Sequence, residues 1–350
     1  MSQYIISKVH HTDLRTIAEV DTLLSKEGIR RDANLDYTCV MYDEDYHVIA
    51  TGSCFGNTLR CFAVRSDHQG EGLLNEIVTH LMEIEFERGY VHLFLYTKIK
   101  SAAMFRDLGF YEIGRVNQSL VFMENRKNGF HNYLKKLLKE SGGRKEGISA
   151  AIVMNANPFT LGHQYLIEHA AYACETVHIF LLSEDVSLVP LAVRKKLVKE
   201  GIADFSNVIL HESGPYIISN ATFPSYFLKD EMDVIDTHAK LDLEVFAKIA
   251  ETLQITRRYV GEEPFSLVTG RYNAIMKEKL PEKGIECVVL PRKECKEAVI
   301  SASTVRELIA REDWKELKQY VPQSTWNYFQ SEESKAVVDR IQKADQVRHY

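Results

Sequence analysis

Residues 157–163, in the second half of the sequence, combine residue types that could handle phosphate groups. The segment ends in Gly162-His163 and carries a hydroxyl, Thr160, three positions before the histidine. An imidazole and a hydroxyl at the start of a helix can donate hydrogen bonds to phosphate oxygens as charge builds up during displacement at phosphorus. Gly162 would allow the backbone to approach a ligand closely. The alternative is an Asn-Pro turn in which His163 is a partly buried structural histidine.

A second segment with phosphate-binding character is residues 300–306, Ile-Ser-Ala-Ser-Thr-Val-Arg. Ser303 and Thr304 are expected to begin a helix whose first N–H groups can bind phosphates. Within one turn, Arg306 adds a positively charged guanidinium group with several donors. The alternative is a capping box formed by Thr304 and Glu307. Capping and phosphate binding use different donors of one helix terminus, so the two interpretations are compatible.

Both segments are expected at the same edge of one sheet. Residues 148–154 form a continuous apolar run, which is typical of a parallel strand covered on both faces. Further strands are predicted, separated by helical patterns, at residues 177–183, 207–212, 257–261 and 286–290. This alternation predicts a doubly wound, Rossmann-like α/β sheet, in which ligands bind beyond the carboxyl ends of the strands. Polar residues that follow each apolar run are therefore site candidates.

Two more groups of candidates follow predicted strands. Arg194 and Lys195 open a helix, where they would contact a triphosphate or an anionic substrate; the alternative is a solvated basic helix face. Gly261 and Glu262 come directly after the strand at 257–261 and would face a ribose or an adenine. The alternative for this pair is a charged turn that ends at Pro264.

The first half of the sequence contains a glycine-bearing loop of its own. Residues 64–73 connect a predicted strand, 58–64, to an amphipathic helix, and Gly70 and Gly72 lie in this loop. Backbone N–H groups of the loop and of the helix N-terminus would face one small volume, which suits a pyrophosphate. A plain strand-to-helix turn is the alternative.

That loop resembles the acyl-CoA-binding loop of the GNAT acetyltransferase family, whose pattern is Q/R-x-x-G-x-G/A. Residues 100–110, which end in Leu-Gly-Phe, resemble the helix and turn that close the same fold, so the likeness covers about residues 1 to 125. It implies that Gln69, Gly70 and Gly72 bind a CoA-like arm. Asp67 departs from the pattern, because the family usually has Gln or Arg there, and this speaks against acetyltransferase activity.

Length and composition predict two folded domains. The chain has 350 residues, of which 45% are apolar and 26% charged, so one average core would be too small for it. The apolar helix pattern at 130–140 is followed by a Ser-Gly-Gly break. The expected organisation is therefore a first domain at 1–140, which carries the GNAT resemblance, a second α/β domain at 148–330 and a C-terminal tail at 331–350, expected as a helix for packing or contact.

Several classes of function are disfavoured. A formal charge of −6 is unsuited to a protein that binds nucleic acid through phosphate neutralisation. The start lacks signal-peptide character and no apolar run approaches the roughly 20 residues that span a bilayer, so a cytoplasmic protein without a membrane partner is expected. The six cysteines are scattered without a CxxC pair, which predicts reduced thiols, and no metal held by the protein itself is predicted.

Residues 157–163 and 300–306 resemble the T/HxGH and ISxSTxxR signatures of the nucleotidyltransferase superfamily, with Thr160 and His163 in the first and Arg306 closing the second. Class I aminoacyl-tRNA synthetases share the HxGH turn, but this chain lacks their KMSKS loop. The chain also resembles the citrate lyase ligase family, both in the order of its two domains and in three longer stretches. These stretches are 155–171, 213–229 and 258–265, the last with Thr269 and Tyr272-Asn273.

The resemblance implies an acid-thiol ligase that uses acetate and ATP, with Mg²⁺ bound to the ATP, to acetylate a prosthetic-group thiol through an acetyl-adenylate. The acceptor would be the acyl carrier protein of citrate lyase, which bears a dephospho-CoA-type thiol. Two alternatives are an adenylyltransferase of another small substrate such as phosphopantetheine, and a non-catalytic carrier-binding protein. The catalytic candidates are His163, Thr160 and Arg306, and the ATP-binding candidates are Asn155, Asn157, Pro158, Phe159, Gly162, Arg194, Lys195, Gly261, Glu262, Ser301, Ser303 and Thr304.

Overall fold

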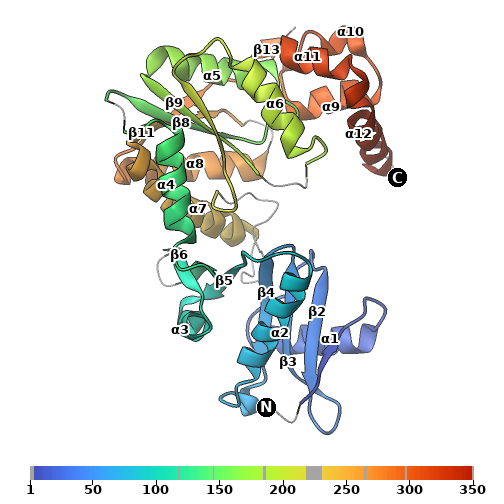
Figure 1. The fold of residues 1–350 in the computed structure, drawn as a ribbon. Coiled ribbons are helices and arrows are strands. Elements are labelled where there is room, and N and C mark those ends of the chain that lie inside the picture. The colour runs from blue at the N-terminus through green and yellow to red at the C-terminus, as the bar shows by residue number, and fades with distance from the viewer. Residues whose placement is uncertain are drawn as a thin grey trace. The chain divides into compact units, whose positions relative to one another are not determined.

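The computed structural model describes residues 4–116, 119–144, 146–183, 187–217, 231–263, 266–295 and 298–348. Contacts divide the chain into two compact units, each of which contains a sheet and its helices (Figure 1). Unit 1 comprises Met1–His131 with Phe223–Glu244, and unit 2 comprises Asn132–Thr222 with Val245–Tyr350.

Unit 1 is built on a mixed sheet in which the described residues form seven strands, in the order β1-β2-β3-β4-β5-β7-β6. Neighbouring strands are antiparallel except β4 and β5, which run parallel and pair only at Thr58–Phe94 and Leu59–Leu95. Beyond these two pairs the strands separate. The strands are β1 (Ile6–Lys8), β2 (Tyr37–Tyr42), β3 (Val48–Phe55), β4 (Thr58–Val64), β5 (Phe94–Lys98), β6 (Tyr111–Val116) and β7 (Leu120–Glu124).

Helices cover both faces of this sheet. Cys39 and Met41 of β2 join an apolar cluster with α2 and α3, whereas Val40 joins a second cluster with α1. Successive side chains of a strand point to opposite faces, so α1 lies on one face and α2 and α3 lie on the other. These helices are α1 (Leu14–Lys26), α2 (Leu73–Glu87) and α3 (Ile99–Asp107).

Unit 2 contains the predicted doubly wound sheet. In the described part of the chain it has five strands, all parallel, in the order β10-β9-β8-β11-β12. All five strands correspond to the predicted apolar runs, which confirms the predicted fold class. They are β8 (Ser149–Met154), β9 (Thr176–Leu181), β10 (Val208–Glu212), β11 (Ile255–Gly261) and β12 (Glu286–Leu290). The chain starts in the middle at β8, adds strands on one side, and then crosses to β11, so the switch point lies between β8 and β11.

Helices pack on both faces of the unit 2 sheet (Figure 1). Ile179 and Leu181 of β9 share a core cluster with residues of α5 and α6, while Phe180 between them contacts Phe246 of α7. The helices that flank the strands are α4 (Gly129–Glu140), α5 (Leu161–Ala173), α6 (Leu191–Gly201), α7 (Glu231–Leu253), α8 (Leu267–Glu282) and α9 (Ala302–Ala310), with the short hairpin β13 (Glu294–Cys295) and β14 (Ala298–Val299) before α9.

The C-terminal segment packs onto unit 2. Val337 and Ile341 of α12 (Lys335–Arg348) are buried in the same core cluster as Val305 and Ile309 of α9. Two further helices, α10 (Trp314–Leu317) and α11 (Gln323–Phe329), precede it. The segment expected as a tail therefore contributes core side chains.

Helix α4 belongs mainly to unit 2, although the sequence pattern placed it at the end of the first domain. The hydroxyl of Tyr133 donates to the Glu212 carbonyl at 3.2 Å, and the Glu140 carboxylate lies 2.8 Å from His211 Nδ1. The contact division accordingly falls at Asn132, earlier than the expected boundary at 140. Among the helices of the described ranges, none has the length and apolar character needed to cross a membrane.

Candidate functional site

The turn after β8 and the start of α5 form a closed hydrogen-bonded unit. Thr160 is the N-cap of α5: its hydroxyl accepts the N–H of His163 at 3.3 Å, and its own N–H donates to His163 Nδ1 at 3.1 Å. Asn157 Oδ1 accepts the N–H of Val189 at 2.9 Å. These local bonds satisfy donors at the helix start and hold the turn in one conformation.

This capping arrangement decides which nitrogen of His163 carries the proton. Nδ1 accepts the Thr160 N–H, so the neutral ring must be protonated at Nε2. Burial, and to a smaller extent the positive charge of Arg292, lower the pKa of His163 to about 4. The imidazole is therefore neutral near pH 7 and offers Nε2–H as a donor. The capping role of His163 uses Nδ1 and is compatible with the predicted role as a phosphate donor, which would use Nε2.

The second segment begins α9 with a cap that differs from the expected one. Ser301 is the N-cap and its hydroxyl accepts the N–H of Thr304 at 3.0 Å. The alternative of a Thr304–Glu307 capping box is thus wrong, because Thr304 lies one turn inside a helix that Ser301 already caps. The N–H of Thr304 is used in this bond. The remaining donors of the first turn are those of Ala302 and Ser303.

The structure brings the two segments together. A Cβ atom added to Gly162 would lie 3.2 Å from the carbonyl oxygen of Ile300, so the absence of a side chain permits this approach. Arg306 Nη1 donates to the Asn157 carbonyl at 2.6 Å, and Nη2 donates to Ser303 Oγ at 3.0 Å. Arg306 therefore ties the start of α9 to the turn after β8.

Arg194 does not reach the open edge of the sheet. Its side chain is fully buried, and its guanidinium donates to the carbonyls of Asn155, Leu182 and Val189 at 2.8 to 3.0 Å. It joins the ends of β8 and β9 to the start of α6, which is a structural role. Lys195 forms an ion pair with Glu212. Neither predicted contact with an anion is thus prepared in this structure.

Other candidates of the turn divide between exposed and buried positions. Asn155 is exposed, although its Oδ1 accepts from Arg194 and from Ser187. Pro158 and Phe159 are buried, and the Phe159 carbonyl accepts the hydroxyl of Thr325 at 2.9 Å. These two residues support the turn from the core side.

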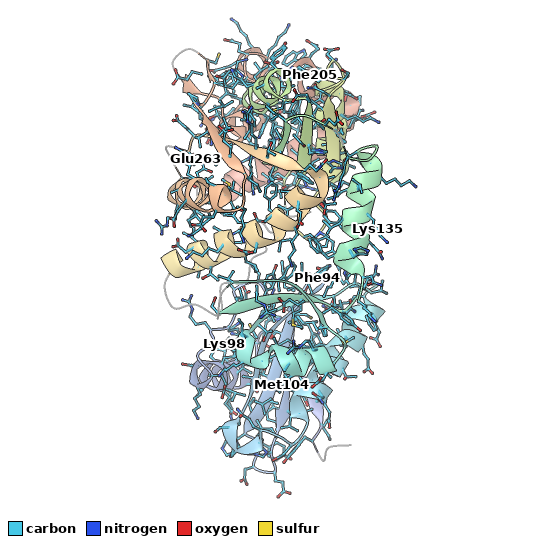
Figure 2. The ribbon with its side chains drawn as sticks, turned by 90° about the vertical axis from the view of Figure 1, so that its left-hand side faces the viewer. Phe94, Lys98, Met104, Lys135, Phe205 and Glu263 are labelled. Carbon is cyan, nitrogen blue, oxygen red and sulfur yellow. The ribbon has the colours of Figure 1, made fainter. Side chains whose placement is uncertain are left out.

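Gly261 and Glu262 lie at the carboxyl end of β11, next to β8 in the sheet. The Gly261 carbonyl accepts Asn273 Nδ2 at 2.9 Å, and the N–H of Glu262 donates to the Leu290 carbonyl at 2.8 Å. Glu263, labelled in Figure 2, follows them and forms an ion pair with Arg292. Pro264 and Phe265, and residues 218–229 of another predicted stretch, lie outside the described residues.

Arg292 is a site residue that the sequence analysis did not name. It follows β12 after one proline, and its charge acts on His163. The rule that polar residues after apolar runs are site candidates applies to it as well as to Asn157 or Glu262. Residues 286–290 were a predicted strand, so this signal was present in the sequence.

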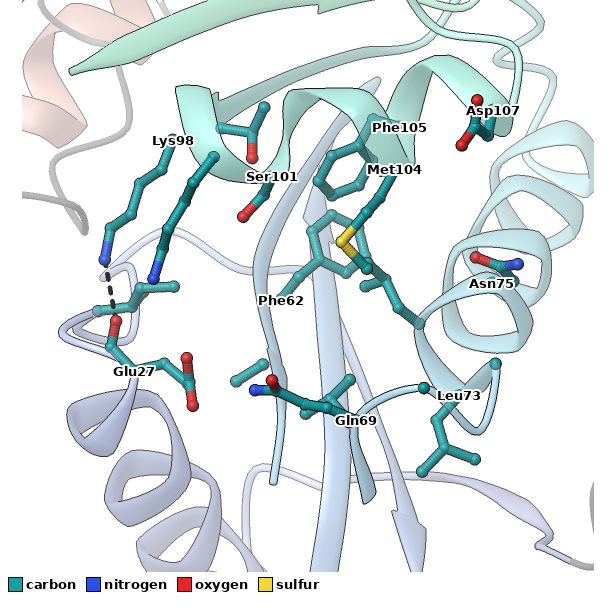
Figure 3. A pocket seen from close by; sticks show the side chains of 18 of the residues that line it. Glu27, Phe62, Gln69, Leu73, Asn75, Lys98, Ser101, Met104, Phe105 and Asp107 are labelled. Atoms are coloured by element: carbon teal, nitrogen blue, oxygen red, sulfur yellow. Dashed lines mark hydrogen bonds between the residues drawn. The ribbon is translucent and has the colours of Figure 1, made fainter. Parts of the chain in front are cut away.

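A separate cavity of about 610 Å³ lies in unit 1, where β4 and β5 separate (Figure 3). Gln69, Gly70 and Gly72 line it, together with Lys98 and Lys100. Gly72 is the N-cap of α2 with φ of 83°, a left-handed conformation that favours glycine. The cavity therefore combines a backbone cradle at a helix start with two cations.

Asp67 does not line this cavity. Its carboxylate accepts Arg65 Nε at 2.8 Å, and this bond lowers the pKa of Asp67. The departure of Asp67 from the family pattern therefore does not place its carboxylate in the cavity. Lys98 Nζ donates to the Glu27 carbonyl at 2.9 Å, and burial, then the charge of Lys100, lowers the pKa of Lys98.

One cluster in unit 1 has side chains of the kind that bind metal ions, Asp36, Cys54 and Glu85. Arg88 Nη1 lies 2.8 Å from both carboxylates and 3.6 Å from the Cys54 sulfur. The guanidinium already supplies a positive charge at this position. We therefore treat the cluster as a structural ion-pair network rather than a metal site.

Fold and site together define the class: an α/β protein whose second unit places both nucleotidyltransferase signatures at the switch point of a doubly wound sheet. Residues 149–329 match the family model described as the citrate lyase ligase C-terminal domain. The chain belongs to the citrate lyase ligase family.

Relatives over nearly the whole chain support this membership. The chain is 36% identical to the [citrate [pro-3S]-lyase] ligase of Haemophilus influenzae, covering 91% of this chain and 96% of the relative. The protein of the same name from Klebsiella pneumoniae is 38% identical, with 88% and 91% covered, and that from Escherichia coli is 36% identical, with 93% and 94% covered. A GNAT-family acetyltransferase structure from Staphylococcus aureus is 11% identical and covers 35% of this chain and 100% of its own, with a TM-score of 0.30.

Proposed function

We propose that this chain is an ATP-dependent acid-thiol ligase that acetylates the prosthetic-group thiol of the citrate lyase acyl carrier protein. Acetate and ATP would be consumed, and AMP and pyrophosphate released. The observation that carries the proposal is the close approach of Gly162, which precedes the neutral His163, to Ile300 before α9, at the switch point of the sheet. The family membership supplies the acceptor.

The first step would form an acetyl-adenylate. An acetate oxygen attacks the α-phosphorus, a new P–O bond forms, and the bond to pyrophosphate breaks with its electron pair leaving on pyrophosphate. Nε2–H of His163 and the N–H groups at the start of α9 would donate to phosphate oxygens as their charge increases. Donors fixed by capping need little reorganisation. Mg²⁺ would arrive with ATP and neutralise charge on the departing pyrophosphate.

Other residues of the site would act by positioning these donors. Thr160 holds His163 in the productive tautomer through its backbone N–H. Arg306 fixes α9 against the turn through the Asn157 carbonyl and adds positive potential beside Ser303. Gly261 and Glu262, at the end of the neighbouring strand, would border the ribose or the adenine.

The second step would transfer the acetyl group. The carrier thiolate attacks the acetyl carbonyl carbon, the C–O bond to AMP breaks, and AMP leaves with the electron pair. A free thiol has a pKa near 8.5, so positive potential near the arm would increase the reactive thiolate fraction.

The cavity of unit 1 would hold the thiol-bearing arm of the carrier. A dephospho-CoA-type group carries phosphates, and the loop at Gln69, Gly70 and Gly72 presents backbone donors at the start of α2. Lys98 and Lys100 would add attraction for the same phosphates. A volume of about 610 Å³ is in the range of small-molecule sites.

Product analysis tests the proposed function. Purified protein, MgATP, labelled acetate and the thiol form of the carrier should give AMP, pyrophosphate and acetyl-carrier in equal amounts, each dependent on acetate. A dinucleotide-like product formed from phosphopantetheine would instead identify an adenylyltransferase. Carrier binding without any turnover would identify a non-catalytic protein. Either of these outcomes contradicts the proposal.

A further inference from the structure

Arg292 projects donors into the site from the strand next to β11. Its Nε donates to the Glu262 carbonyl at 2.6 Å, and its Nη2 pairs with the Glu263 carboxylate. These bonds use one edge of the guanidinium. Among the described residues Nη1 has no acceptor, and 29% of the side chain is exposed. A positioned arginine with donors still available can bind an anion from solvent.

The chain after Arg292 connects it to the two signature segments. The N–H of Ile300 donates to the Lys293 carbonyl at 2.9 Å, and the Ile300 carbonyl lies beside Gly162. Lys293 Nζ lies 5.7 Å from the ring centroid of Tyr165 on α5. The chain segment that contains β13 and β14 therefore begins and ends at the same place. Arg292, the turn after β8 and the start of α9 therefore lie near one another.

The cations first expected to neutralise phosphate are already engaged. Arg194 is buried against three carbonyls, and Lys195 is paired with Glu212. Arg306 donates to Asn157 and to Ser303. A triphosphate brings several negative charges to the site, and hydrogen bonds from a guanidinium fork are well suited to them.

We propose that Arg292 binds the triphosphate of ATP, and that Glu263 is a positioning residue that holds its guanidinium toward the phosphates. This inference rests on the proposed ATP site and deepens it. The Nε–Nη2 edge is held by the protein, and Nη1 donates to phosphate oxygen. The charge of Arg292 also helps to keep His163 neutral, so the two residues supply one cationic and one neutral donor.

Binding measurements without acetate or carrier test the proposal apart from the ligase reaction. Calorimetry would measure MgATP and adenosine affinities for wild type, Arg292→Gln and Arg292→Lys. We expect Arg292→Gln to weaken MgATP binding about tenfold or more and to leave adenosine binding within about twofold, since only the triphosphate loses a charged partner. Arg292→Lys should recover part of the loss. Equal weakening of both ligands, or unchanged MgATP affinity in Arg292→Gln, overturns the proposal.

The positioning role of Glu263 is tested by combining variants. Glu263→Ala should weaken MgATP binding and Glu263→Gln should weaken it less, because the amide oxygen can still accept from Arg292. The double variant with Arg292→Gln should bind MgATP no more weakly than Arg292→Gln alone. Additive losses would show that Glu263 does not act through Arg292.

Titration of His163 provides a readout that needs no ligand. Replacing Arg292 by Gln should raise the pKa of His163, measured by NMR of the imidazole nitrogens, whereas Arg292→Lys should leave it low. An unchanged pKa in Arg292→Gln contradicts the placement of the guanidinium beside the imidazole. If wild type binds MgATP but shows no acetate-dependent turnover, the ligase proposal fails and the role of Arg292 stands.

Discussion

Each unit contains a loop that leaves a strand and starts a helix, but the two loops are built differently. In unit 2 the turn before α5 is fixed by side chains, with Thr160 and His163 capping each other and Asn157 bonded to Val189. In unit 1 the loop before α2 is shaped by glycines with positive φ, and Gly72 caps the helix without a side chain. The same kind of strand-to-helix connection can thus serve a reactive site or a cradle.

This difference predicts separate functions for the two loops. Polar side chains that are held in place can stabilise charge as it develops in a reaction. We therefore expect the chemical step to take place in unit 2. Backbone donors lining a cavity bind a phosphate group without reacting, which suits the carrier's arm in unit 1. Variants that affect one loop and spare the other can break this distinction or sharpen it.

The largest effect is expected at His163. His163→Ala should reduce the rate of acetate-dependent AMP formation about 100- to 1000-fold, because removal of one preorganised donor to a developing oxyanion typically costs that much. His169→Ala is the matched control on α5, since His169 is exposed and bonded to the Tyr165 carbonyl. A His163→Ala enzyme with at least half of wild-type activity would falsify the assigned role.

Replacement of glycine should affect the two loops differently. Gly162→Ala places a Cβ 3.2 Å from the Ile300 carbonyl, which must move by a few tenths of an ångström just before α9, and we expect about a tenfold loss of pyrophosphate exchange. Gly72→Ala meets no atom within 4 Å but strains a left-handed residue, which costs about 1 kcal/mol. Thermal unfolding and acetate-dependent exchange of pyrophosphate into ATP, which needs only the first step, are measured on both variants. Gly72→Ala alone should show a stability loss without a loss of exchange. Equal activity losses would contradict the separation.

A smaller effect is expected on the pH dependence of stability. The pKa of His163 is lowered to about 4 in the folded protein, against about 6.5 in an unfolded chain. Between these values the unfolded chain binds more protons, so this contribution is fully present above pH 6.5 and is lost as the pH falls toward 4. His163→Gln should flatten this part of the urea-unfolding profile relative to wild type. A variant profile parallel to that of wild type would show that the imidazole is not held neutral.

The smallest effect is expected at Asp67. Because its carboxylate pairs with Arg65 and does not line the cavity, Asp67→Ala should change the KM for the carrier less than about twofold. Steady-state kinetics with varied carrier would measure this. A marked fall in KM would place the carboxylate beside the bound arm after all.

Local signals in the sequence predicted most of unit 2. Continuous apolar runs located all five strands of the described sheet, and two short signatures located the turn after β8 and the start of α9. These features depend on neighbouring residues, which the sequence shows directly. The alternative cap considered for α9 was Thr304, whereas Ser301 caps it; two hydroxyls three residues apart can both cap a helix.

The remaining features depend on contacts between distant residues. In the sequence Arg194 resembles a solvated helix residue. Its guanidinium is directed inward because it donates to carbonyls after β8 and β9, which are distant in the sequence. Arg292 follows a predicted strand, but the pairing of β12 with β11, which brings Arg292 to Glu262, depends on distant residues. The apolar stripe of α4 predicted a helix but not the unit against which it packs. That unit is known only from the contacts of Glu140 with His211 and of Tyr133 with Glu212.

The most direct test of the two-site account compares two reactions in one variant. Gly70→Val with Gly72→Val fills the unit 1 loop and leaves unit 2 unchanged. Acetate-dependent exchange of labelled pyrophosphate into ATP, which needs only the first step, should proceed in this variant at the wild-type rate, while acetyl transfer to the carrier should fall at least tenfold. Equal loss of exchange and transfer would contradict the account, as would the absence of exchange in wild type.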